Sequence, residues 1–128
     1  MKYVDTDIFV YWATDHPEHG KRATEILRHI EVNEKAVSST LSLWLFHKVM
    51  RNAQGYSFSA FLDQVTRFRN LKFVAVDFDV LRDAAQASKE FGVPEEVAVA
   101  YTVAKDRGAD AVYSTNPEFD RTDIKRVF

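Results

Sequence analysis

The sequence contains no cysteine, and this absence excludes several classes of function at once. Without thiols the chain cannot form a disulfide scaffold, a thiolate zinc site or a cysteine nucleophile. A chain without disulfides suits a reducing compartment, so we expect the protein to be cytoplasmic. No apolar run approaches the roughly 18 residues that a membrane span needs, and no basic leader opens the sequence. We therefore expect no membrane association.

Glycine and proline are scarce too, with four and three residues respectively, and no stretch is rich in serine or proline. The sequence therefore offers no linker, no repeat and no low-complexity segment. Its 128 residues, of which 46% are hydrophobic, are enough to build one core without a structural metal. We expect a single domain over residues 1–128.

Neither sign of charge dominates, because the formal net charge is only −2. Proteins that bind nucleic acid through their overall charge carry a clear excess of lysine and arginine. Any contact with RNA must therefore come from a local basic patch. Two groups of residues are candidates: Arg67 with Arg69, and Arg121 with Lys125 and Arg126. The alternative is that these side chains only form a solvated surface.

What the sequence does contain is an alternation of strand and helix patterns. Short apolar segments predict strands at residues 3–4, 36–38, 71–76 and 111–113. Helical spacing of apolar residues predicts helices at 17–30, 39–49, 57–68, 80–91 and 94–107. This alternation predicts the α/β class, with three α/β/α layers around a central, mostly parallel sheet. In such folds a ligand binds at the carboxyl ends of the strands.

Oxygen-bearing side chains follow these predicted strands or begin a predicted helix. They are Asp5, Asp7, Glu95, Glu96, Asn116 and Glu118. Oxygen ligands without histidine or cysteine suit a hard cation such as Mg²⁺ or Mn²⁺, which one or two carboxylates and substrate phosphates commonly hold. Such a site favours phosphodiester hydrolysis. Each residue also has a structural interpretation, as a helix N-cap, a partner of a helix dipole or a turn residue.

Three segments carry a family resemblance, in order along the chain. Residues 3–11 read YVDTDIFVY, residues 38–45 read SSTLSLWL, and residues 114–120 read STNPEFD. Together with the helix expected near residues 92–109, they resemble the PIN domain family. That family opens on a strand followed by Asp-Thr-Asn and closes on Thr/Ser-x-Asp-x-x-Phe. The resemblance covers essentially the whole chain and implies the PIN-like form of the α/β fold.

The resemblance also implies a set of metal-site residues, from which this sequence departs. Asp5 matches the first metal-binding aspartate, whereas the second family acid aligns with Leu45 and is absent. The third acid aligns with Glu96 or, one residue away, with Glu95. The fourth aligns with Asn116, which keeps an oxygen but loses the charge. We expect Asp5 and Glu96 to bind the metal and Asn116 to complete the catalytic set.

Four further side chains are expected around that set: Asp7, Glu95, Ser114 and Glu118. Asp7 stands where asparagine is usual in the family, and the hydroxyl of Ser114 could orient a phosphate or a water.

The activity that the resemblance implies is that of a metal-dependent endoribonuclease with Mg²⁺ or Mn²⁺ as cofactor. It further implies the toxin of a VapC-type toxin–antitoxin pair, which acts on RNA, forms a homodimer and binds a small antitoxin protein. The replaced acids favour an alternative, a weakened PIN module that binds RNA or a protein partner without cleavage. A third hypothesis is a different doubly wound phosphotransfer domain, to which the closing pattern is less suited.

Overall fold

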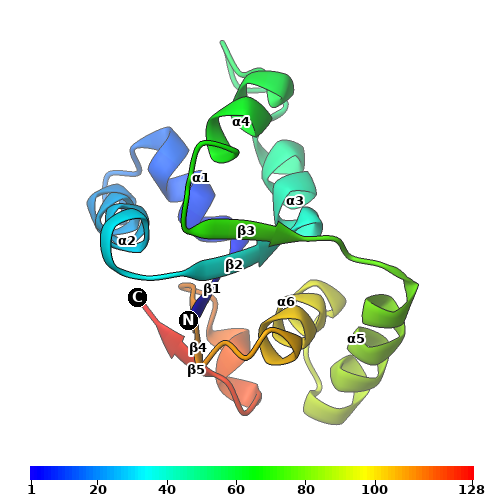
Figure 1. Ribbon diagram of the computed structural model, residues 1–128. Helices are drawn as coiled ribbons and strands as arrows, with labels where there is room; N and C mark the ends of the chain where they lie inside the picture. The colour runs from blue at the N-terminus through cyan, green and yellow to red at the C-terminus, as the bar shows by residue number, and fades with distance from the viewer.

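The computed structural model describes all residues from 1 to 128 and contains a five-stranded sheet (Figure 1). The strands are β1 (Lys2–Val4), β2 (Ala36–Ser39), β3 (Leu71–Val74), β4 (Ala111–Tyr113) and β5 (Lys125–Val127). Their order across the sheet is β3-β2-β1-β4-β5, and every neighbouring pair is parallel. The sequence therefore predicted the parallel sheet correctly but missed its last strand.

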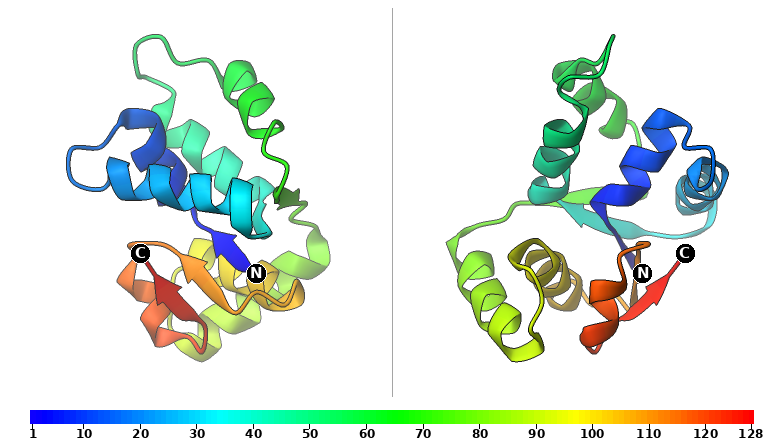
Figure 2. Two further views of the ribbon diagram at one scale, coloured as in Figure 1. Left: turned by 60° about the vertical axis from the view of Figure 1, so that its left-hand side comes forward. Right: turned by 180° about the vertical axis from the view of Figure 1, so that it is seen from behind.

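Helices cover both faces of this sheet, which confirms the predicted three layers (Figures 1 and 2). One face carries α1 (Thr6–Thr14), α2 (Gly20–Asn33), α3 (Thr40–Met50) and α4 (Phe58–Val65). The other carries α5 (Phe78–Phe91), α6 (Glu95–Asp106) and the short 3₁₀ helix η1 (Pro117–Arg121). No helix has both the length and the apolar character that crossing a membrane would require.

Each face of the sheet has its own core, because successive side chains of a strand point to opposite faces. Tyr3 and Val4 are neighbours in β1 and both are fully buried. Tyr3 packs with Val103 and Phe119 on the side of α6 and η1. Val4 packs with Phe9 on the side of α1 to α4. The central strand is thus packed between two apolar layers.

The observed helix ends follow local chemistry, which also explains where the predicted limits were wrong. Ser57 caps α4 by accepting the N–H of Ala60, and Gly92 ends α5 with a φ of +64°. Helix α2 starts at Gly20 rather than at residue 17 because the chain first makes a turn. In that turn the Nδ1 atom of His16 accepts the backbone N–H groups of Glu18 and His19.

The strand order decides where a ligand can enter. From β1 the chain moves to β2 and β3 on one side, and it returns to place β4 on the other side of β1. A parallel sheet opens a crevice at such a reversal, at the carboxyl ends of the two strands concerned. Here the two strands are β1 and β4.

Candidate functional site

A cavity of about 340 Å³ lies at the carboxyl ends of β1 and β4. Its polar lining includes four residues singled out from the sequence: Asp5, Asp7, Glu96 and Asn116. Asp5 directly follows β1, and Asn116 follows β4. Segments more than a hundred residues apart in the chain therefore meet at one place.

Asp5 occupies the N-cap position of α1, but its carboxylate does not cap the helix. Instead its Oδ2 atom accepts a hydrogen bond of 2.7 Å from the hydroxyl of Ser114, which is fully buried. Burial, followed by the negative charges of Asp7 and Glu96, raises the pKa of Asp5 to about 7. The capping interpretation of Asp5 is therefore wrong, and its ionised form is costly in this position.

Asp7 lies in the first turn of α1 and is tied to the segment after β4. Its Oδ2 atom accepts the backbone N–H of Thr115 at 2.7 Å and the hydroxyl of Thr115 at 2.6 Å. Its Oδ1 atom is buried and has no hydrogen-bond partner. A buried carboxylate oxygen without a partner is unusual and needs a cation or a water to satisfy it.

The geometry separates the two glutamates that the sequence left as alternatives. Glu96 lines the cavity, and its charge contributes to the raised pKa of Asp5. Glu95 does not line the cavity. The residue after them, Val97, is buried and also lines it. Glu96 is thus placed to take part in the site, and Glu95 is not.

Asn116 reaches the cavity, although its side-chain oxygen is already engaged. The Oδ1 atom accepts the backbone N–H of Glu118 at 3.0 Å and so caps η1. This leaves the amide nitrogen, a hydrogen-bond donor, as the free end of the side chain. Glu118 does not line the cavity and lies 3.7 Å from the guanidinium of Arg121. The structure therefore does not bring Glu118 to the site.

The opposite wall of the cavity is apolar. It is formed by α3 and α6, with Leu45 at the position where the resemblance places the second acid. At the floor, the buried hydroxyl of Tyr3 contacts the hydroxyls of Ser39 and Ser42 at 2.9 and 3.1 Å. Burial raises the pKa of Tyr3 to about 12, so this phenol stays neutral.

Two residues of the site were not predicted from the sequence, although a feature of the sequence pointed to each of them. Tyr11 lies four residues after Asp7, which places both on one face of α1, and its hydroxyl contacts that of Thr115 at 2.9 Å. Tyr3 was interpreted only as an apolar strand residue. A tyrosine in a fully buried strand usually needs a partner for its hydroxyl, and that rule would have pointed to the serines after β2.

The donor set fits one weakly held hard cation. No ion pair engages Asp5, Asp7 or Glu96, and the only cation whose charge acts on the pair of aspartates at longer range is Arg126, which interacts with Asp7. An unpartnered Asp7 oxygen is available as well. Against this, no three histidine or acidic side chains converge into a complete metal site. Mg²⁺ keeps several waters and needs only one or two carboxylates, so it suits this set, whereas an all-protein cage does not exist.

Comparisons with known proteins agree with the fold and with the segments described above. The family model described as "PIN domain" matches residues 2–125. No sequence among curated proteins matches the chain significantly.

Three solved structures with the same fold illustrate the likeness. The toxin VapC20 of Mycobacterium tuberculosis, described as cleaving the sarcin–ricin loop, gives a TM-score of 0.81 at 14% identity over 99% of this chain and 98% of that one. VapBC2 of Rickettsia felis, bound to promoter DNA, gives 0.72 at 16% identity over 99% and 98%. A toxin–antitoxin complex of Klebsiella pneumoniae gives 0.66 at 16% identity over 100% and 97%. At these identities the likeness establishes the fold.

Proposed function

Because the chain belongs to the PIN domain family, we propose that it is a metal-dependent endoribonuclease that uses one Mg²⁺ or Mn²⁺ ion in the crevice between β1 and β4. The observation that carries this proposal is the pair Asp5 and Asp7, which form no ion pair and share a crevice whose lining contains no cationic side chain. Burial, followed by repulsion from the charge of Asp7, raises the pKa of Asp5 to about 7, so ionising Asp5 is unfavourable there. A bound cation would reverse this cost.

Asp5 and Glu96 would hold the ion, which would polarise a phosphoryl oxygen of RNA and lower the pKa of a water. The chain itself supplies orientation. The hydroxyl of Ser114 fixes Asp5, and Thr115 fixes Asp7 through its backbone and its hydroxyl. These bonds hold both carboxylates in one geometry before substrate arrives. The free amide nitrogen of Asn116 is able to donate to a phosphate oxygen.

The apolar wall favours a second candidate function, the binding of RNA or of a protein partner without cleavage. Leu45 and Val97 face the cavity and offer no ligand to a cation. A site with two carboxylates and one exposed glutamate holds Mg²⁺ more weakly than one with a further acid. The same crevice would then serve as a recognition pocket of the kind that mixes apolar walls with a few polar groups.

Cleavage of a mixed set of single-stranded RNAs, with Mg²⁺, with Mn²⁺ and with EDTA, tests the proposal. Asp5→Asn should reduce metal-dependent cleavage at least about a hundredfold, since it removes about 3 kcal/mol of charge stabilisation. Glu96→Gln should have a smaller effect, and Glu95→Gln, its neighbour outside the cavity, should have none. Cleavage that survives in EDTA or in Asp5→Asn would contradict the proposal. A folded protein that cleaves nothing with either metal would favour the second candidate.

The toxin role and the protein partner belong to the same proposal. Two of the similar structures are described as complexes of a toxin with its antitoxin or as a VapBC assembly. In this chain, Trp44 and Val49 of α3 are 52% and 62% exposed, and Val49 borders the crevice. A small antitoxin segment packed there would bury apolar surface and block the site. Co-purification with the product of a small adjacent gene, and light scattering to detect a homodimer, would test these two points.

A further inference from the structure

A second cavity, of about 350 Å³, lies at the opposite end of the sheet. It is lined by residues that precede or begin the strands, together with the end of α6. Four of its eight lining residues are cationic: Lys35, Arg69, Lys72 and Arg107. None of the eight is acidic. We name this cavity the basic groove.

The four cations of the basic groove are not paired. All four are exposed, and none of them forms an ion pair. None of their side chains forms a hydrogen bond within the protein either. Four positive charges around one hollow repel one another and create a positive potential, which attracts an anion.

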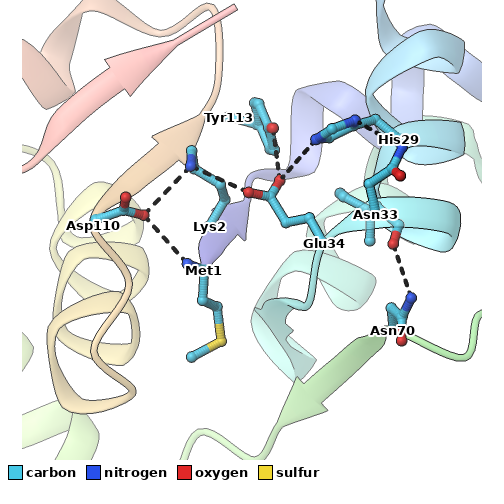
Figure 3. Close-up of polar contacts among 9 residues, drawn as sticks. Met1, Lys2, His29, Asn33, Glu34, Asn70, Asp110 and Tyr113 are labelled. Carbon is cyan, nitrogen blue, oxygen red and sulfur yellow. Dashed lines mark hydrogen bonds and ion pairs between the residues drawn. The ribbon is translucent and has the colours of Figure 1, made fainter.

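Three acids at this end of the sheet, Glu31, Glu34 and Asp110, contact groups outside the basic groove or the backbone of its loop. The Nζ atom of Lys2 lies 3.2 Å from a carboxylate oxygen of Glu34 and 3.5 Å from one of Asp110. Figure 3 shows Lys2 between these two acids. Glu34 also accepts the hydroxyl of Tyr113. The carboxylate of Glu31 accepts the backbone N–H groups of Arg69 and Asn70 and thereby fixes the loop before β3. These three acids are therefore engaged outside the groove and leave Lys35, Arg69 and Lys72 in surplus, whereas Arg107 also lines a neighbouring hollow with Asp77, Asp79, Asp83 and Asp106.

We propose that the basic groove binds the phosphate group of a nucleotide unit, either a free nucleotide or a nucleotide within an RNA chain. A volume of about 350 Å³ is at the lower end of small-ligand sites, which suits a nucleotide. Lysine and arginine are the side chains that bind phosphate oxygens, and Asn70 adds an amide to the lining. The proposal does not depend on cleavage, because the groove and the crevice lie at opposite ends of the strands.

The test uses the full chain in EDTA, so that no metal-bound phosphate forms in the crevice. The probes are a single-stranded RNA decamer labelled at its 3′ end, with or without a 5′ phosphate, and adenosine 5′-monophosphate as competitor. Binding is followed by fluorescence anisotropy at several salt concentrations. The variant is Lys35→Gln/Arg69→Gln/Lys72→Gln. Its matched control, Lys21→Gln/Arg28→Gln/Lys89→Gln, removes three exposed and unpaired charges from α2 and α5.

The groove variant should bind RNA about tenfold or more weakly, with a salt dependence reduced by about 2 in slope, as expected for three phosphate contacts on a single strand. The control should stay within about twofold of the unmodified protein on the same reasoning. Competition by the monophosphate would identify free nucleotides as the ligand, and preference for the 5′-phosphorylated decamer would identify RNA ends. Equal binding of both decamers without competition would identify internal phosphates.

Three outcomes would overturn the proposal: a groove variant that binds like the unmodified protein, a control that loses as much affinity, or no binding of any probe. Circular dichroism confirms that each variant is folded. Metal-dependent cleavage tests the nuclease proposal and binding in EDTA tests this one, so failure of the nuclease proposal and failure of this one are distinguishable.

Discussion

Folding shifts the pKa values of two aspartates, one at each end of the sheet, in opposite directions. At the carboxyl ends, burial and like charges raise the pKa of Asp5 to about 7. At the amino ends, Asp110 experiences some desolvation, but a hydrogen bond from its own backbone and the charge of Lys2 outweigh it and lower its pKa. The protein supplies a cation to Asp110 and none to Asp5. A carboxylate without a built-in partner is therefore the better candidate for binding an ion.

The largest effect that this comparison predicts concerns Asp5→Asn and stability. The folded-state pKa of Asp5 lies above the unfolded value of 3.8, so protonated Asp5 favours the folded state and ionised Asp5 disfavours it. Stability from this group is fully present below pH 4 and is lost as the pH rises towards 7. Asp5→Asn should thus stabilise the metal-free protein at pH 8 by on the order of 2–4 kcal/mol.

Urea unfolding of both proteins in EDTA, from pH 4 to pH 8, measures this difference. The advantage of Asp5→Asn should grow between pH 4 and pH 7 and then level off. If the difference in the free energy of unfolding stayed constant with pH, ionisation of Asp5 would not destabilise the folded protein.

A smaller effect, on Mg²⁺ affinity, is predicted for Leu45→Glu, which places a carboxylate on the apolar wall of the crevice. The added charge should tighten Mg²⁺ binding about tenfold, because affinity for hard cations rises with the number of charged ligands. Thermal unfolding with increasing Mg²⁺ reports this change as a larger shift in Tm. Leu81→Glu, on an exposed leucine of α5, is the matched control and should not change the Mg²⁺ response.

The smallest predicted effect is at the other end of the sheet. Asp110 has a lowered pKa, so its contribution is present above pH 4 and is lost as the pH falls through the folded-state value. Its side chain is 69% exposed, so Asp110→Asn should cost no more than about 0.5 kcal/mol at pH 7. Unfolding at pH 7 and pH 3 checks this. A gain in stability at pH 7 would remove the contrast with Asp5.

Much of the fold was predictable because its signals are local. The strand ending at Val4, the caps Ser39 and Ser57, and the stop at Gly92 all depend on neighbours in sequence. Strand β5 was missed because it has only three residues and begins with Lys125 and Arg126. It pairs with β4 through backbone bonds that no side-chain pattern announces.

The sites were predictable to different degrees. Asp5 and Glu96 were expected from the sequence and do face one cavity, and their roles in metal binding stay predictions. Of the cations of the basic groove only Arg69 was a candidate from the sequence, because the four are spread from residue 35 to residue 107 and only the fold gathers them. The basic cluster expected near the C-terminus is largely neutralised: Arg126 binds Asp120 through two hydrogen bonds. Basic residues that are close in sequence were therefore a poor guide to a basic patch, because a nearby acid pairs with one of them.

Calorimetric titration with Mg²⁺ and with Mn²⁺ tests most directly the claim that the crevice is an incomplete, cation-accepting site. We expect the unmodified protein to bind one ion weakly, Asp5→Asn to bind none, and Asp110→Asn to bind like the unmodified protein. Absence of binding to the unmodified protein, or equal binding by Asp5→Asn, would contradict the account.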